Sequence, residues 1–436
     1  MESANSNLIF IRDVGQGTFG TVEEWQREAE SVALKRFKDG LTSDCLREII
    51  FLRALKSVPK MVEFRGIHTT TNDEILIEMP LYDCDLYQYG SNLSFLQRIS
   101  FFWEVADQLM QSISTLHHFS ILHRDIKPNN ILLKFHETNA VFDLYLADFG
   151  SSCMLLNNIR AVSKEQESIS NCQPDTQENE LSKDIFTIGF RAPEIIQQLT
   201  YDHKADIFAL GMTLVYFLFD AVPSEPLIAA DMHRWIKREV KKNTKSIDAS
   251  IIDLLISLTQ YDKNDRTMMI KENLTRNLSL SDLGPKKDWR NVNPNLSTKV
   301  YFEYVLWMCD VMPSSVTFLI AIDTLDRYLF EIGDVEQIEF RKLCISCCIL
   351  VGRFLMNNPF KVSDFCKTEK YQLQIERLIV EILFVLDCRI LLPIECSELI
   401  HIDKSMLKRM LLNLQKHQKI PANYSFEQLF KKYFEC

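Results

Sequence analysis

Four polar side chains lie in two short stretches of this 436-residue sequence. "HRDIKPNNILL" contains Asp125, Lys127 and Asn130, and "LADFG" contains Asp148. A carboxylate such as Asp125 can accept the proton of an attacking hydroxyl group. Asn130 and Asp148 offer the hard oxygen ligands that Mg²⁺ prefers. The two stretches therefore indicate chemistry at a hydroxyl group beside a metal-bound phosphate.

Three glycines, Gly15, Gly17 and Gly20, lie between two runs that have the pattern of strands. This glycine spacing is a weak signal alone, because dinucleotide-binding sites use it too. Those sites need a helix after the glycines, whereas "TVEEW" continues as a strand. A strand–glycine–strand hairpin can fold over phosphates, with its backbone N–H groups close to the oxygens.

Lys35 in "VALKRF" and Glu48 in "LREII" are the next pair with a shared chemistry. A lysine that grips phosphate oxygens must be held in place, and a carboxylate on a helix can hold it. Taken alone, such a lysine and glutamate are more often solvated surface residues.

The elements that must position these residues follow from the apolar pattern. Short β-branched and aromatic runs predict strands between residues 8 and 80, with one helix in "DCLREIIFLRAL". From residue 98 apolar residues recur every three or four positions, as in a helix. Residues 163–184 carry six acids and no apolar period, which predicts a long solvated loop. The polar stretch 281–297 is the best candidate for a domain boundary, and helical periods follow it.

Composition and charge exclude several classes of protein. The formal net charge of −10 does not favour a nucleic-acid partner. No run is long and apolar enough for a membrane span, and the N-terminus has no secretory pattern. Twelve cysteines at irregular spacing are then expected to be reduced thiols of an intracellular protein, in the cytoplasm or nucleus. Cys344, Cys347 and Cys348 fall at helical spacing among apolar residues, which favours core packing over a metal site.

Residues 8 to about 280 resemble a eukaryotic-type protein kinase. The motifs that carry the resemblance stand in the family's order: "VGQGTFGTV", "VALKRF", "HRDIKPNNILL", "LADFG", "TIGFRAPE", "DHKADIFALG" and "YDKNDRT". The resemblance implies an α+β, bilobal fold, with an antiparallel sheet and one helix in the N-terminal lobe and a helical C-terminal lobe. It implies ATP and Mg²⁺ as cofactors and protein substrates as partners. Lys127 resembles the serine/threonine branch and would stabilise charge on the moving phosphoryl group.

The resemblance also assigns structural and nucleotide-binding roles. Glu194 would pair with Arg266, and Asp206 would anchor the catalytic loop. The residues expected around the nucleotide, besides the glycines, Lys35 and Glu48, are Val22, the gatekeeper Met79, the hinge residues Pro80 to Tyr82, and Asp85. Proline has no N–H, but the family uses only the carbonyl at that hinge position and takes the N–H from the position of Tyr82.

The stretch "TSDCLRE" (42–48) resembles the helix by which cyclin-dependent kinases bind a cyclin. The resemblance implies that Arg47 and Arg124 hold a phosphorylated Ser182, in an activation segment that ends near Thr187. The family's third arginine is replaced by Cys153, so phosphate-driven ordering is expected to be weaker. In the glycine loop, Phe19 stands where the family carries an inhibitory tyrosine.

Residues 298 to about 392 resemble a single cyclin box. Trp307, Asp326, Arg327 and Leu329 match the family pattern, and the pair that engages the kinase falls at Arg353 and Glu376. Glu303 and Tyr304 replace the small apolar neighbours of the substrate-docking patch. The alternative is an ordinary helical bundle, because apolar helix faces are usually core.

We therefore predict a kinase domain (1–280), a linker (281–297), an all-α cyclin-like domain (298–400) and a helical tail (401–436). The cyclin-like domain would activate the kinase in cis through an intramolecular contact, in a monomer with no nucleic-acid or membrane partner. An activating kinase would be a further partner. Two alternatives stay open: a non-catalytic binding protein whose cyclin-like domain captures another kinase or regulator, and an active kinase whose helical domain recruits substrates.

Overall fold

The computed structural model describes most of the chain. The residues described are 8–16, 20–38, 40–70, 74–136, 141–154, 189–197, 199–224, 227–242, 247–268, 296, 298–333, 335, 337–356, 359–390, 408–409 and 411–412. The chain forms two compact units. The first contains residues 1–40 and 55–280, and the second contains residues 41–54 and 281–436.

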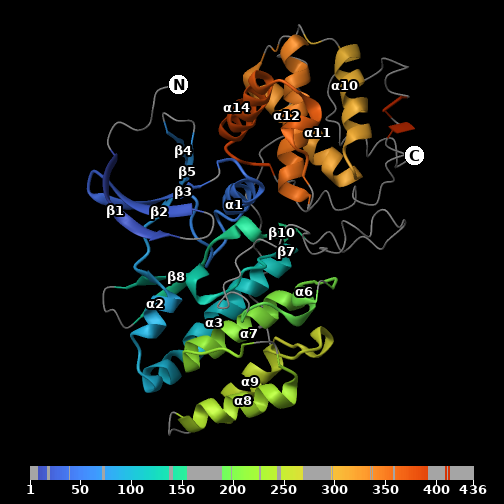
Figure 1. Ribbon diagram of the computed structural model, residues 1–436. Coiled ribbons are helices and arrows are strands. Elements are labelled where there is room, and N and C mark those ends of the chain that lie inside the picture. The colour runs from blue at the N-terminus through green and yellow to red at the C-terminus, as the bar shows by residue number, and fades with distance from the viewer. Residues whose placement is uncertain are drawn as a thin grey trace. The chain divides into compact units, whose positions relative to one another are not determined.

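The first unit begins with a five-stranded antiparallel sheet in the order β1-β2-β3-β5-β4 (Figure 1). Its strands are β1 (Leu8–Gln16), β2 (Gly20–Arg27), β3 (Glu30–Phe37), β4 (Gly66–Thr69) and β5 (Ile75–Pro80). Gly20 opens β2 so close to β3 that a Cβ there would lie 1.9 Å from the carbonyl oxygen of Arg36. Glycine is therefore required at this strand pairing.

Two smaller sheets follow in the same unit. One has the order β6-β8-β9, from β6 (Cys84–Asp85), β8 (Ile131–Phe135) and β9 (Phe142–Leu146). The other pairs β7 (Ile121–Leu122) with β10 (Cys153–Met154). These short strands carry the loops in which the catalytic motifs of the sequence lie.

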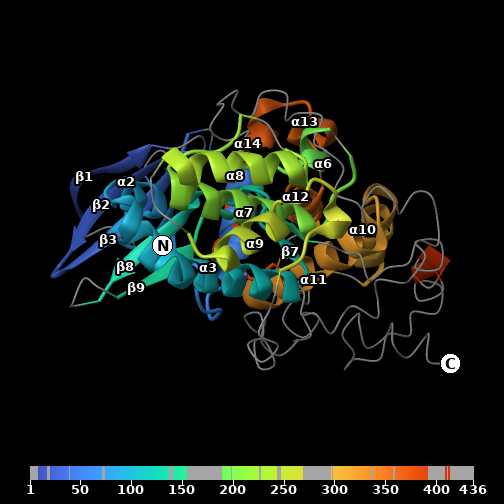
Figure 2. The ribbon, with the colours of Figure 1, turned by 90° about the horizontal axis from the view of Figure 1, so that it is seen from below.

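Helices form the rest of the first unit (Figure 2). They are α2 (Leu86–Ser91), α3 (Phe95–His118), α6 (Pro193–Ile196), α7 (Lys204–Phe219), α8 (Ala229–Lys242) and α9 (Ala249–Leu258). The apolar residues predicted to recur at helical spacing from residue 98 are buried along α3 from Phe102 to Leu116, and α3 packs against α7. α7 is buried along nearly its whole length, so it is the central helix of this lobe.

The second unit consists of helices in the part of the chain that the structure describes. They are α1 (Ser43–Ala54), α10 (Thr298–Val311), α11 (Ser315–Ile332), α12 (Gln337–Leu355), α13 (Val362–Phe365) and α14 (Glu369–Val385). α12 packs against α1, α10, α11 and α14 (Figure 1). Cys344, Cys347 and Cys348 are fully buried on α12, as predicted. Burial raises the pKa of all three thiols, so they remain protonated.

Two features are absent from the described ranges. No helix there is long and apolar enough to cross a membrane. Among the same residues, no group of three or more histidine, cysteine, aspartate or glutamate side chains is arranged to hold a metal ion.

Candidate functional site

The predicted phosphate-binding lysine lies in a row of paired residues across the first sheet. Gly15 of β1 pairs with Val22 of β2, Val22 pairs with Lys35 of β3, and Lys35 pairs with Ile77 of β5. Directly paired residues of antiparallel strands project to the same face. The register therefore places the start of the glycine hairpin, Val22 and Lys35 on one face of the sheet.

Lys35 forms an ion pair with Asp148, with Nζ 3.0 Å from Oδ1. Burial by itself would raise the pKa of Asp148, but the positive charge and hydrogen bond of Lys35 lower it, and Lys127 adds to this effect. The carboxylate is consequently ionised at neutral pH. The backbone of Asp148 is left-handed, with φ of 65°, which is an uncommon conformation for a residue with a side chain. Such strain is often retained at functional sites.

Asp125, Lys127 and Asn130 form one hydrogen-bonded cluster in the loop between β7 and β8. Lys127 Nζ and Asn130 Nδ2 each donate to Asp125 Oδ2 at 2.8 Å. Asn130 Nδ2 also donates to the backbone carbonyl of Asp125 at 2.8 Å. Both side chains use Oδ2, so neither engages Asp125 Oδ1. That oxygen can accept a proton from a hydroxyl group, and Asn130 Oδ1 remains an oxygen ligand.

Asp206 of α7 anchors this loop, as predicted. Its carboxylate accepts hydrogen bonds from the backbone N–H groups of His123 and Arg124, both at 2.9 Å. Burial would raise the pKa of Asp206, but the hydrogen bond with His117 and nearby charges lower it. His123 is fully buried, and this burial lowers its pKa, so its ring is neutral. The buried carboxylate of Asp206 therefore holds the backbone of the loop that contains Asp125.

The residues predicted around the adenine lie at the end of β5 and just after it. Met79 is buried and pairs with Ala33 of β3, and Pro80 ends the strand. The hydroxyl of Tyr82 accepts a hydrogen bond from the backbone N–H of Glu63 at 3.2 Å, and burial raises the pKa of Tyr82 to about 12. Asp85 caps α2 by accepting from the backbone N–H of Gln88 at 2.7 Å.

Two apolar residues that pair with predicted nucleotide-binding residues were not singled out in the sequence. Ala33 pairs with Met79 and, two positions before Lys35, projects to the same face. Leu132 of β8 pairs with Asp85 and is half-buried between the fully buried Ile131 and Leu133. The stretch "ILLKF" begins as a continuous apolar run, so its residue types do not separate Leu132 from its buried neighbours.

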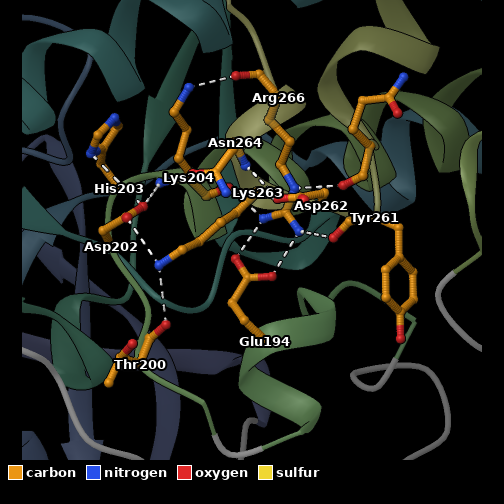
Figure 3. A network of polar contacts seen from close by, with 11 residues as sticks. Glu194, Thr200, Asp202, His203, Lys204, Tyr261, Asp262, Lys263, Asn264 and Arg266 are labelled. Atoms are coloured by element: carbon orange, nitrogen blue, oxygen red, sulfur yellow. Dashed lines mark hydrogen bonds and ion pairs between the residues drawn. The ribbon is translucent and has the colours of Figure 1, made fainter.

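The buried ion pair predicted between Arg266 and Glu194 is present (Figure 3). Arg266 Nη2 lies 2.7 Å from Glu194 Oε2, and Nη1 donates to Oε1, so the pair is bidentate. The guanidinium also donates to the carbonyls of Gln260, Tyr261 and Lys204. The Nζ of Lys204 donates in turn to the carbonyl of Arg266, a contact that the sequence did not indicate.

Arg124 has protein partners in the structure. Its Nε donates to the carbonyl of Ser151, and its Nη1 donates to the hydroxyl of Tyr201 at 2.8 Å. Its predicted contact with a phosphorylated Ser182 stays a prediction. Gly17, Ser182 and Thr187 lie outside the described residues, as do Phe19 of the glycine loop and most of the predicted linker.

The helix that follows Lys35 in the chain, α1, packs within the second unit. Phe51 of α1 and Phe354 of α12 have ring centroids 5.2 Å apart. Arg47 Nη2 donates to the carbonyl of Met356 at 3.3 Å and Nη1 pairs with Asp44 at 3.1 Å. Glu48 is buried in the same helix. Its predicted pairing with Lys35 would join the two units and stays a prediction.

Arg353 and Glu376 lie where this helix begins. Arg353 Nη1 donates to Glu376 Oε2 at 2.8 Å and to the carbonyl of Leu41 at 3.2 Å. At the other end of α1, Arg53 bonds to Asp387, which the sequence had not singled out. This contact could have been suspected from the single arginine in the last turn of a helix that is otherwise expected to be buried.

Comparison with known proteins agrees with this geometry. The protein kinase domain family model matches residues 8–276. Serine/threonine-protein kinase STY46 of Arabidopsis thaliana is 24% identical over 270 residues, which cover 60% of this chain and 42% of that protein. A probable cell division protein kinase of Encephalitozoon cuniculi is 30% identical over 233 residues, which cover 50% of this chain and 72% of that protein.

Sporulation protein kinase mde3 of Schizosaccharomyces pombe is 26% identical over 231 residues, which cover 49% of this chain and 37% of that protein. This chain therefore spans less than half the length of two of the three relatives. The family match ends before the helices α10 to α14, so it says nothing about those helices.

Proposed function

The chain belongs to the protein kinase family and its catalytic domain is that of a serine/threonine kinase, and we propose that its own C-terminal helices activate it. The reaction would transfer the γ-phosphoryl group of ATP to a serine or threonine of a protein substrate. The kinase would be of the cyclin-dependent type, with the helices from residue 298 onward in the role of the cyclin.

Different residues of the first unit would bind ATP, accept the proton and stabilise the developing charge. Lys35, held by Asp148 at 3.0 Å, binds phosphate oxygens of ATP. Asp125 Oδ1 accepts the proton of the substrate hydroxyl while its other oxygen is fixed by Lys127 and Asn130. Lys127 places a positive charge next to that hydroxyl, where it stabilises negative charge developing on the phosphoryl group.

The donor set fits Mg²⁺. Asp148 is ionised, and Asn130 donates through its nitrogen, which leaves its side-chain oxygen as a ligand. Mg²⁺ is commonly held by one or two such oxygens together with substrate phosphates rather than by a protein cage. When bound, the ion would neutralise phosphate charge and orient the γ-phosphoryl group.

The observation that supports activation in cis is the packing of α1 with α12. In this family the helix after the phosphate-binding lysine must be positioned for activity. Here that helix is buried along residues 45–54 within the C-terminal helical unit, with a ring contact to Phe354 and an ion pair with Asp387. Arg353 donates to the carbonyl of Leu41, just before the helix begins. Fusion in one chain keeps the effective concentration of the activator high, on the order of millimolar for a short tether.

The test compares phosphate transfer from ATP to histone H1 by full-length variants. Asp387→Lys reverses the charge that faces Arg53 and should lower activity by about tenfold or more, because α1 loses an anchor. Glu303→Lys makes the same charge change at an exposed position of α10 and should leave activity unchanged. Asp148→Asn lacks the metal-binding carboxylate, so its phosphate transfer defines the background of the assay.

The outcomes separate the proposed parts of the function. Wild-type activity in Asp387→Lys, with the variant folded by circular dichroism, would contradict the activator role of the helices. If the unmodified protein transfers no more phosphate than Asp148→Asn, even after incubation with an activating kinase, the non-catalytic binding protein becomes the better description.

A further inference from the structure

Helix α8 presents a row of positive charges on an otherwise acidic protein. Arginine and lysine side chains recur along it at spacings of three and four residues, and all of them are exposed. These residues, named here the α8 cationic stripe, are Arg234, Lys237, Arg238, Lys241 and Lys242. Positions with this spacing lie on one face of a helix, so the five charges point into the same region of solvent.

Most of this charge has no acidic partner in the part of the chain that the structure describes. Arg234 pairs with Asp231, and Lys242 pairs with Glu239 at 2.6 Å. Lys237, Arg238 and Lys241 have no acidic partner among the residues that the structure describes. Like charges four residues apart on a helix destabilise it. An anionic ligand on the stripe would relieve this repulsion.

The opposite face of α8 is occupied by the core of the first unit. Met232 and Ile236 are buried, and the ring of Trp235 lies edge-on to Phe219 with centroids 5.9 Å apart. A helix that binds a membrane surface must insert its apolar face into the lipid. The apolar residues of α8 are not available for insertion, which disfavours an anionic membrane as the partner.

The size of the stripe distinguishes between the remaining anionic partners. Lys242 lies eight positions after Arg234, so the stripe is about 12 Å long. Four residues of extended peptide span about 13 Å and can carry one acidic charge at each residue. A nucleic acid extends its charge far beyond this length, so most of its phosphates would lie outside the stripe.

We propose that the α8 cationic stripe docks an acidic segment of the protein substrate, at a site separate from Asp125. This inference rests on the proposed kinase function, because it names the class of substrate that the kinase takes. Substrates with a run of acidic residues outside the phosphorylated position would bind more tightly than those without one. The contact acts on binding and not on the chemical step, so it lowers KM and leaves kcat unchanged.

The experiment measures binding directly with the full-length protein. The probe is a fluorescein-labelled peptide with six consecutive glutamates, and the comparison peptide has six glutamines. The test variant is Lys237→Gln/Arg238→Gln/Lys241→Gln, which removes three exposed charges and keeps good helix-forming residues. The matched control is Lys56→Gln/Lys367→Gln/Lys370→Gln, which makes the same change of charge at exposed positions elsewhere.

We expect fluorescence anisotropy to show binding of the glutamate peptide at low salt, weakened about tenfold in the test variant and unchanged in the control. In kinase assays a substrate with an acidic extension should show the same rise in KM at constant kcat. The proposal is overturned if neither peptide binds, or if both variants weaken binding equally. Tighter binding to single-stranded DNA or to phosphatidylserine vesicles than to the peptide would also overturn it.

The binding measurement is independent of catalysis. A protein that binds the glutamate peptide through the stripe but transfers no phosphate would contradict the proposed kinase activity and retain the cationic docking surface. If the protein is an active kinase but its KM is the same with and without the acidic extension, and the same in the test variant, only the docking surface is contradicted.

Discussion

Arg53 and Asp387 lie 334 positions apart in the chain and are joined by three hydrogen bonds. Arg53 Nε donates to the backbone carbonyl of Asp387 at 2.9 Å and to its Oδ2 at 3.0 Å, and Nη2 donates to the same carboxylate oxygen. Burial would raise the pKa of Asp387, but the hydrogen bond and charge of Arg53 lower it. The last turn of α1 is therefore tied to the residues that follow α14.

This pair predicts a measurable coupling between the two residues. Arg53→Met keeps the packing of the arginine stem and removes its charge, while Asp387→Asn keeps the shape of its partner. In a double-mutant cycle by urea unfolding we expect a coupling free energy of about 1–2 kcal/mol. Additive effects of the two substitutions would mean that the ion pair does not hold α1.

The cluster around Asp125 predicts a loss of catalysis without loss of stability. Asp125→Asn removes the proton acceptor but can still accept hydrogen bonds, so kcat should fall by about 10²- to 10⁴-fold. The variant should bind ATP as the unmodified protein does, measured by titration calorimetry. A kcat within threefold of the unmodified protein would rule out Asp125 as the base.

The buried pair of Arg266 with Glu194 predicts a large effect on stability. Arg266→Leu leaves a buried carboxylate and several carbonyls without their donor, so the free energy of unfolding should fall by about 3–5 kcal/mol. Glu194→Gln retains part of the hydrogen bonding and should cost less. Urea unfolding measures both, and equal effects would argue against the importance of the charge.

Glu78 predicts the response of the first sheet to acid. Burial would raise its pKa, but hydrogen bonds with His68 and Arg27 and their charges lower the pKa from 4.5 to about 2. Because the folded-state pKa is depressed, the stabilisation is complete above about pH 4.5 and is lost as the pH falls toward 2. Between pH 5 and 3 the unmodified protein should therefore lose stability more steeply than Glu78→Gln.

The control for this prediction is Glu24, which pairs with the exposed Arg12. Glu24→Gln should change stability by less than about 1 kcal/mol, because its partner Arg12 is exposed and such ion pairs contribute little, and it should leave the pH dependence intact. At pH 7, Glu78→Gln should cost about 1–3 kcal/mol, since Arg27 and His68 lose a charged partner. Identical acid profiles for Glu78→Gln and the unmodified protein would contradict the assignment.

Local pattern was sufficient for much of the fold. The helix predicted in "DCLREIIFLRAL" is α1, and the predicted strand "EILIEM" is β5 apart from one residue at each end. Gly15, Lys35, Asp125 and Asp148 were found because each stands in a short motif whose spacing fits one chemistry. Leu132 was missed because a leucine within a strand has no distinctive type, and its role depends on which neighbours leave it partly exposed.

The sequence by itself determined the class of chemistry, since the side chains that perform it lie in contiguous motifs of distinctive residue types. Only the tertiary structure decided which oxygen of Asp125 is engaged, which residues share a row with Lys35, and that α1 packs among the C-terminal helices. These relations depend on strand register and on contacts such as Arg53 with Asp387, hundreds of residues apart. A local pattern marks such residues as buried but does not identify their partners, because many apolar and charged residues elsewhere have the same chemistry.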